Sequence, residues 1–400
     1  MNKTDIKHIF LIMNIFIAAC IETDIYLPAF ADMMKYFSAS EQSIQSLLTW
    51  NFIGLCVSGP FYGPLSDSYG RKKPLLLALG LFLIGSFFTL FAQDFQMMLF
   101  GRVLQGLGSG GCFTLGTAII FDVFHKEKAI QALNIMNSTV PFMMATAPMV
   151  GGYLNHVYGF RSNFLVITLF VLFSFLICAF FFKEPLPSNK RTPFSYKKVA
   201  KDFRRVFVCI PFWQLTFVIS FLFAGYLTFL SGIAVLYVVE FGVSKAWFPL
   251  YQGAMLLAYL IASLTCTPFI HRWGIGKLKL LGAIAAILGA LSFLIISFMT
   301  PEHPVLLTLT MLPFAFGFIW TQTPYVSELM EILPDIKGIA ASLLTSTRLL
   351  ITASMVGLAS LLYNGTIYPL VFVVLLTVVI VIPLLLCCER ASKENFFSSR

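Results

Sequence analysis

Long apolar runs recur along the 400-residue chain, and no other feature constrains its fold as much. Each run is about 20 residues long, the length that a helix needs to cross the hydrocarbon core of a bilayer. Hydrophobic residues make up 58% of the chain and charged residues only 11%, whereas soluble proteins carry about 25% charged residues. The sequence therefore predicts a helical membrane protein with many spans. It excludes a soluble enzyme, a disordered protein, a disulfide scaffold and a nucleic-acid binder.

Twelve apolar segments can be counted, and most of the connections between them are short. Their limits are 8–30, 43–63, 74–92, 96–121, 129–150, 162–182, 211–239, 246–270, 278–300, 304–326, 338–361 and 365–388. The longest polar stretch runs from Lys183 to Arg205, is rich in Lys and Arg, and divides six segments from six. We therefore predict an N-terminal six-helix bundle over 1–183, a basic cytoplasmic linker over 184–208 and a C-terminal six-helix bundle over 209–400.

The distribution of Lys and Arg predicts the orientation of the segments. With both termini on the cytoplasmic side, 22 of the 27 basic residues fall on that side and 3 on the other, while Arg102 and Arg348 lie inside apolar segments. Such an imbalance matches the positive-inside rule. The net charge of +9 therefore reflects membrane topology, and we expect no nucleic-acid partner. The first segment carries Glu22 and Asp24 and lacks a small-residue cleavage site, so we expect a retained helix and not a signal peptide.

Neither a metal site nor an enzymatic site is predicted. The eight cysteines lie within or at the edge of apolar runs, and no pair has the C-x-x-C spacing. The five histidines lie at segment ends or in loops without metal-ligand spacing. We therefore expect no cofactor. A membrane-embedded enzyme or a sensor would need a catalytic constellation or an appended domain, and the sequence offers neither.

The most specific motif is Gly63-Pro-Leu-Ser-Asp67-Ser-Tyr-Gly70-Arg71-Lys-Lys, and a related pattern recurs over 267–277 in the second half. The motif resembles the loop 2–3 motif of the major facilitator superfamily, and the repeat matches the two-halved plan of many secondary transporters. This resemblance implies two pseudo-symmetric six-helix bundles. It also implies a cytoplasmic latch formed by Gly63, Asp67, Gly70 and Arg71. Asp67 can sit near a helix N-terminus, where the helix dipole favours a negative charge, and Asp122 is the predicted partner of Arg71.

The fourth segment carries an arginine, Arg102, inside the membrane. Burying it costs at least ~2.5–3.5 kcal/mol on insertion scales, so an intramembrane partner is expected. At 1.5 Å per residue, Asp24 and Arg102 both lie about 9 Å from the outer ends of their segments, near residues 30 and 96. They therefore share a depth, and the sequence leaves open whether their side chains meet.

The fifth segment contains Ala147-Pro148-Met-Val-Gly151-Gly152. This string resembles the G-P-x-x-G-G antiporter motif, which the family associates with exporters, although alanine replaces the first glycine. Proline and paired glycines permit a bend and close helix packing.

The first segment contains Glu22-Thr-Asp24-Ile-Tyr26-Leu-Pro28-Ala. It resembles helix one of the Bcr/CflA-type drug:proton antiporters. Two carboxylates in one membrane helix are costly unless they are functional or neutral. We predict Asp24 as the principal proton-coupling group and Glu22 as a second titratable or cation-recognising group, and we assign Arg102 to the same proton-coupling set. Residues two apart on a helix point about 200° away from each other, so both cannot face the same part of a cavity.

Together these features predict a proton-coupled exporter of small amphipathic compounds. We expect a bacterial inner-membrane protein, monomeric, with the substrate, protons and lipid as its partners. An alternative is a transporter of one metabolite, such as an amino acid, a nucleoside or a siderophore-like compound, with Arg348 near the midplane holding a carboxylate or phosphate. The residues predicted to line the substrate cavity are Tyr26, Asn51, Gln105, Asn137, Tyr226, Tyr251, Trp320, Gln322 and Arg348.

Overall fold

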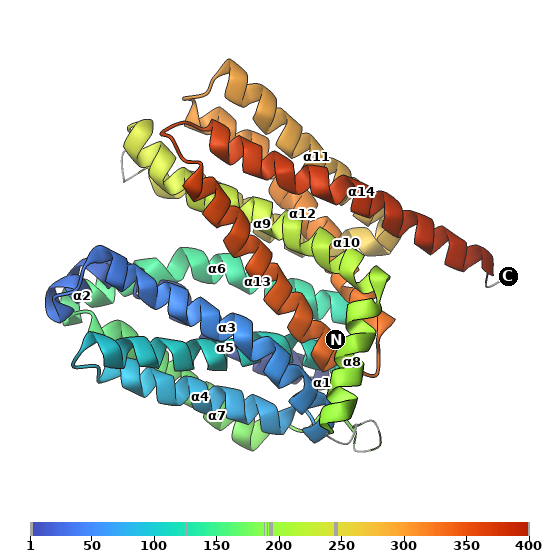
Figure 1. Cartoon of the computed structure of the whole chain (residues 1–400), viewed down its shortest axis with the longest axis horizontal. Coiled ribbons are helices and arrows are strands. Elements are labelled where there is room, and N and C mark those ends of the chain that lie inside the picture. The colour runs from blue at the N-terminus through green and yellow to red at the C-terminus, as the bar shows by residue number, and fades with distance from the viewer. Residues whose placement is uncertain are drawn as a thin grey trace. The chain divides into compact units, whose positions relative to one another are not determined.

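The computed structural model describes residues 3–124, 127–187, 189, 191, 195–243 and 247–398. Within these residues, twelve long helices follow one another along the chain (Figure 1). They are α1 (Lys3–Asp24), α3 (Glu41–Tyr69), α4 (Lys72–Leu90), α5 (Phe95–Val123), α6 (Glu127–Tyr158), α7 (Arg161–Phe181), α9 (Ile210–Val235), α10 (Phe248–Trp273), α11 (Ile275–Met299), α12 (Pro304–Ile332), α13 (Lys337–Leu361) and α14 (Tyr368–Ser398). The shorter elements are α2 (Phe30–Phe37), α8 (Tyr196–Val208), the 3₁₀ turn η1 (Leu27–Ala29) and the π-helical turn η3 (Leu236–Glu240).

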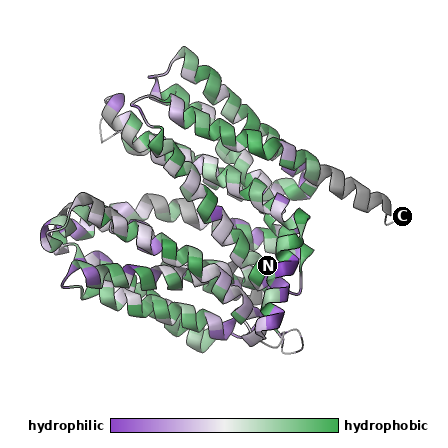
Figure 2. Ribbon diagram, in the orientation of Figure 1, coloured by the Kyte–Doolittle hydropathy of each residue, from purple (hydrophilic) through white to green (hydrophobic). Residues whose placement is uncertain are grey.

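The long helices confirm the predicted all-α membrane fold. Among the residues that the structure describes, ten helices are long and apolar enough to span a membrane. Helix α7 shows why these helices need a membrane around them. It carries an exposed apolar stripe formed by Leu165, Leu169, Phe173, Leu176 and Phe180. An exposed stripe of this kind suits contact with lipid and not with water. Apolar residues dominate the long helices, whereas polar residues gather on α8 (Figure 2).

The chain divides into two compact units, and the first comprises residues 1–204 together with 333–346. In this unit α5 packs against α3 and α4, and α1 packs against α5 and α6. Helices α3 and α5 touch through their backbones: a Cβ at Gly106 would collide with the carbonyl oxygen of Asn51. Small residues that permit such close approach are characteristic of helix packing in membranes.

The second unit comprises residues 205–332 and 347–400. Here α12 packs against α11 and α10, and α9 packs against α14. Phe229 of α9 and Phe293 of α11 meet edge to face, with their ring centroids 5.3 Å apart. The first turns of α13 fall in the predicted C-terminal bundle, yet they belong to the first compact unit. Lys337 Nζ donates to the carbonyl oxygen of Phe121 and Ser346 Oγ to that of Cys56, and Asp67 adds the contacts described below.

The first apolar segment is not one helix over 8–30, because α1 ends at Asp24. Pro28 explains this end. Proline has no N–H to donate to the carbonyl group four residues earlier, and its ring clashes with that group. The chain turns and continues as η1 and α2. Asp24 is therefore the last residue of α1, and the apolar span continues beyond it through η1 to Ala29.

Candidate functional site

A buried ion pair joins α1 to α5 in the first unit. Arg102 Nη1 lies 2.6 Å from Glu22 Oε2, and both side chains are fully buried. Among the described residues, the carboxylate that compensates Arg102 is therefore Glu22 and not Asp24. Two positions on a helix separated by two residues point about 200° apart. Glu22 is fully buried, whereas Asp24 is half-buried.

Hydrogen bonds extend this pair into a network. Glu22 Oε1 accepts from Asn51 Nδ2 at 2.9 Å and from Ser109 Oγ at 3.2 Å. Arg102 donates to Gln105 Oε1 at 2.8 Å and to the Tyr26 hydroxyl at 2.9 Å. Its guanidinium carbon also lies 4.4 Å from the centre of the Tyr26 ring, a cation–π distance. A buried charge survives in apolar surroundings when it is paired and hydrogen-bonded in this way.

The network is not saturated. Arg102 Nε and Asn51 Oδ1 are buried without a hydrogen-bond partner among the described residues. Tyr26, Asn51 and Gln105 are all fully buried here, so in this structure they serve the ion pair and do not line an open surface. Their predicted role as cavity-lining residues stays a prediction.

Asp24 lies at the edge of this network, half-buried at the end of α1. It has no ion-pair partner among the residues that the structure describes. The predicted antiporter motif packs directly beside it. A Cβ at Gly151 of α6 would collide with the carbonyl oxygen of Ile25, and one at Gly152 would touch the Pro28 ring at 3.7 Å. Helix α6 continues as one helix through Pro148. The motif therefore holds α6 against the turn that follows Asp24.

The predicted latch residues do come together. Arg71 Nη1 lies 2.7 Å from Asp67 Oδ1, and Arg71 Nε lies 2.6 Å from Asp122 Oδ2. Burial alone lowers the pKa of Arg71, but Asp67 and Asp122 beside it raise the pKa above its ordinary value. The guanidinium therefore stays charged while it holds both carboxylates.

Asp67 also caps the start of α13. Its two carboxylate oxygens accept from the backbone N–H groups of Gly338 at 3.0 Å and Ile339 at 3.2 Å. A negative charge at a helix N-terminus is favoured by the dipole and by the free N–H groups there. Gly63 permits the approach, since a Cβ there would lie 2.8 Å from the carbonyl oxygen of Gly338. The sequence predicted a helix N-terminus near Asp67 but could not identify it as that of α13.

Gly70 makes the turn between α3 and α4 with a positive φ of 87°, which favours glycine. A carboxylate that the sequence analysis missed, Glu184, fills the space beside it. Glu184 accepts from the backbone N–H groups of Arg71 at 2.8 Å and Lys72 at 3.0 Å. No motif marks Glu184, which is one of two acidic residues in the basic linker, the other being Asp202. Ser109 was also missed, although it follows Arg102 by seven residues, or about two helical turns, and so shares its face.

In the second unit an arginine lies among aromatic rings. The guanidinium carbon of Arg348 lies 5.0 Å from the centre of the Phe223 ring. Among the described residues it has no acidic partner, and its Nε is buried without a hydrogen bond. Phe223 leads to an aromatic cluster, which we define as Phe223, Tyr226, Tyr259 and Phe318.

Three other residues predicted to line the cavity lie in the second unit: Tyr226, which belongs to the aromatic cluster, Trp320 and Gln322. The Tyr226 hydroxyl and Gln322 Oε1 are buried without partners among the described residues. Trp320 Nε1 donates to the carbonyl oxygen of Ala262 at 3.1 Å. The fold therefore places Tyr226 in the aromatic cluster and Arg348 against it. Trp320 is instead hydrogen-bonded to α10. The side chain of Asn137 lies outside the part of the chain that the structure describes.

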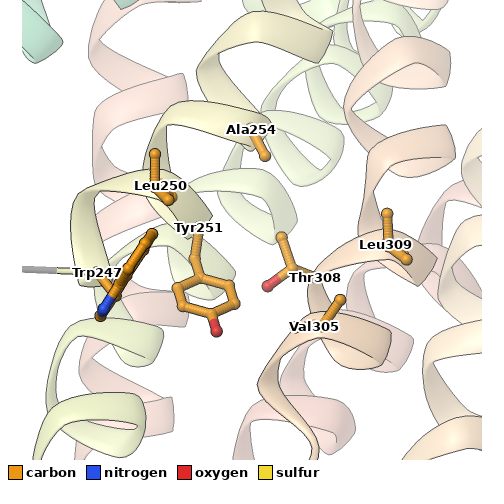
Figure 3. Close-up of a pocket in the computed structure, with 7 residues that line it drawn as sticks. All are labelled: Trp247, Leu250, Tyr251, Ala254, Val305, Thr308 and Leu309. Atoms are coloured by element: carbon orange, nitrogen blue, oxygen red, sulfur yellow. The ribbon is translucent and has the colours of Figure 1, made fainter. Parts of the chain in front are cut away.

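Tyr251 lines a separate, mostly apolar pocket of about 290 Å³ between α10 and α12. It stands between Trp247 and Thr308 in this pocket (Figure 3). Tyr237 packs edge to face against the Tyr251 ring, and its hydroxyl pairs with that of Thr308 at 3.1 Å. Tyr251 therefore lines a different site from the aromatic cluster beside Arg348.

Comparison with known proteins gives a consistent result. The family model of the Major Facilitator Superfamily matches residues 12–356. An uncharacterised transporter of this type from Bacillus subtilis, YdgK, is 29% identical over 323 residues, covering 78% of this chain and 79% of the relative. The bicyclomycin resistance protein homolog of Haemophilus influenzae is 26% identical over 363 residues, covering 87% of each protein.

A solved structure shares the fold. The transporter FucP, described in an outward conformation, superposes with a TM-score of 0.75 at 17% identity, covering 95% of this chain and 97% of FucP. At this identity the likeness concerns the fold alone. It agrees with the twelve long helices described above.

Proposed function

The chain belongs to the major facilitator superfamily, a family of membrane transporters for small molecules, and from the geometry above we propose that it exports small amphipathic compounds in exchange for protons by alternating access. The bicyclomycin resistance protein homolog among its relatives supports export. The antiporter motif against α1 supports exchange. The observation that carries the proposal is the fully buried pair of Glu22 and Arg102.

The buried pair provides a physical basis for coupling. A proton on Glu22 would cancel its charge and leave Arg102 uncompensated in apolar surroundings, which is strongly unfavourable. Protonation would therefore shift the relative free energies of conformations that solvate Arg102 differently. A proton moving through this site would thus drive a conformational change, and a conformational change would release the proton.

Asp24 suits the role of proton acceptor in this scheme. It is half-buried at the end of α1, whereas Glu22 is fully buried. A proton from the surrounding water would reach Asp24 first and then act on the pair. We therefore retain Asp24 as the principal proton-coupling group, with Glu22 and Arg102 converting its charge state into movement.

The latch would bias the conformational equilibrium. Breaking the bonds from Asp67 to Gly338 and Ile339 would remove two of the contacts that tie the start of α13 to the first unit. The triad of Asp67, Arg71 and Asp122 would hold it until the substrate or a proton favours the alternative state.

Export into everted vesicles tests this function. With a proton gradient applied, vesicles carrying the native chain should accumulate a cationic dye, and Asp24→Asn and Glu22→Gln should reduce accumulation to the level of empty vesicles. Glu328→Gln is the matched control, because Glu328 forms a part-exposed ion pair with Lys279 away from the network. Dye accumulation by Asp24→Asn at the native rate would refute the assignment of Asp24.

A second candidate function rests on Arg348. An arginine without an acidic partner among the described residues suits a carboxylate or phosphate on the substrate. The alternative is therefore transport of one metabolite, such as an amino acid, a nucleoside or a siderophore-like compound, with Arg348 holding its carboxylate or phosphate. Uptake or export of an anion that disappears in Arg348→Gln, without loss of dye export, would favour it.

The cellular setting follows from the same features. We propose that the chain acts as a monomer in a bacterial inner membrane with both termini in the cytoplasm. Its two compared relatives are bacterial, and the Lys and Arg distribution favours this orientation.

A further inference from the structure

A crevice in the second unit combines a cavity, a row of hydroxyl groups and a carboxylate. It has a volume of about 240 Å³ and lies between α9, the last turns of α13 and the start of α14. Its polar lining comes from Thr228, Ser231, Ser360, Tyr363 and Thr366. Ser231, Ser360 and Tyr363 are exposed at its mouth, and Thr228 is fully buried at its floor.

The hydroxyl at the floor is available to a ligand. Thr228 Oγ1 is buried and has no hydrogen-bond partner among the described residues. By contrast, Thr352 and Thr265 in other helices of this unit both donate to the carbonyl group four residues earlier. Buried polar groups are nearly always hydrogen-bonded. The free hydroxyl at the floor of a cavity therefore marks a place where a ligand atom fits.

The carboxylate of Glu240 gives the mouth of the crevice a negative charge. Tyr363 OH donates to Glu240 Oε1 at 2.9 Å. This bond holds the carboxylate beside the lining, and Glu240 itself is exposed. Gly365, with a φ of 80°, turns the chain so closely that a Cβ there would lie 3.5 Å from Glu240 Oε1. A carboxylate beside hydroxyl groups and an aromatic ring favours a cation.

The backbone is widened at the same point. Helix α9 ends in the π-helical turn η3, which begins at Leu236 in the wall of the crevice and ends at Glu240. Turns of this type occur mostly as local bulges in helices, frequently at functional sites. Here η3 begins with Leu236, which lines the crevice, and ends with Glu240, which carries the carboxylate.

We propose that this crevice binds a small organic cation, with its protonated amine at Glu240 and Tyr363 and its body directed toward Thr228. Its volume suits a compound of about ten non-hydrogen atoms and is below the usual range for drug-sized ligands. The site lies within the second unit and is separate from the Glu22 and Arg102 network. Its role in selecting exported cations rests on the proposed function, but the binding itself does not.

Binding to the purified full chain in phosphatidylcholine nanodiscs tests the site. Calorimetric titration with benzylammonium, benzyl alcohol and benzoate compares a cation, a neutral analogue and an anion of similar size, with empty nanodiscs as the blank. We expect benzylammonium to bind at least tenfold more tightly than either analogue. Glu240→Gln should remove this preference, and Thr228→Val should weaken benzylammonium binding threefold to tenfold.

Two further variants make the test specific. Tyr363→Phe keeps the ring and removes the bond to Glu240, and we expect about a threefold loss of benzylammonium affinity. Thr377→Val is the matched control: Thr377 is fully buried, donates to the carbonyl oxygen of Val374 and is not part of the crevice lining. It should bind like the native chain. Thermal melting of every variant confirms that it is folded.

Equal affinities for benzylammonium and benzyl alcohol, or an unchanged preference in both Glu240→Gln and Tyr363→Phe, would overturn the proposal. Binding needs no proton gradient, so the result of the binding experiment is independent of the result of the export experiment. Binding with no proton-driven export would refute the proposed function and leave the site intact. Export of a cationic dye without benzylammonium binding would refute the site alone.

Discussion

Each unit holds an arginine within a long apolar helix, and the two differ in burial and in how their charge is compensated: Arg102 is fully buried, whereas Arg348 is half-buried. Arg102 in the first unit is fully buried against Glu22 and bonded to Gln105 and Tyr26. Arg348 in the second unit lies over the Phe223 ring and has no acidic partner among the described residues. A compensated charge can be switched by a proton, whereas an uncompensated one is available to bind an anion. Substitutions at the two arginines should therefore differ in their effects on stability and on binding.

The largest expected effect tests the compensated arginine. Arg102→Gln leaves Glu22 buried without its counter-charge, which should reduce stability by about 3–5 kcal/mol. Chemical denaturation of the purified protein in detergent would measure the loss. Glu22→Gln combined with Arg102→Gln should recover part of it, because the double variant holds no unpaired charge. If the double variant is as unstable as Arg102→Gln alone, the two side chains do not act as a pair.

Tyr26 in the first unit and Tyr226 in the second allow the same comparison, between a hydrogen-bonded buried group and one unpartnered within the described part of the chain. Tyr26→Phe removes a hydrogen bond to a charged group and should cost about 1.5–3 kcal/mol. Tyr226→Phe removes a buried hydroxyl without a partner among the described residues, so we expect no loss of stability. Thermal melting of both variants under one condition would show the contrast. Equal destabilisation by the two substitutions would contradict the difference between the units.

The smallest effect on stability is expected at the uncompensated arginine. Arg348→Gln removes a charge whose burial no carboxylate offsets, so stability should stay within about 0.5 kcal/mol of the native value or increase. Binding should change instead, with an anionic substrate losing affinity and a cationic one keeping it. A loss as large as that of Arg102→Gln would reveal a counter-charge for Arg348.

Local patterns predicted the helices and the latch well. Apolar run length predicted the twelve long helices. The latch of Asp67 and Arg71 was implied by the resemblance of the motif over 63–73 to that of the major facilitator superfamily, with Asp122 as the predicted partner of Arg71. These features depend on periodicity, charge and short-range turns. They are therefore readable from the sequence.

The partner of Arg102 was not predictable in the same way. Depth arithmetic placed Asp24 level with Arg102, but the carboxylate that pairs with Arg102 is Glu22, two residues earlier on α1. The rotation of α1 about its axis decides which acid faces α5, and packing sets that rotation. The capping of α13 by Asp67 spans 271 residues of sequence, so no local pattern could reveal it.

The contact between Gly151 and the Ile25 carbonyl group has a consequence for motion. Two backbones in direct touch leave no room for one to slide or swivel past the other, so the end of α1 and the middle of α6 must travel as one piece. Spin labels placed on these two segments should keep a fixed separation throughout a transport cycle. A bulky side chain at position 151 would wedge the pair apart and carry the aspartate at position 24 with it.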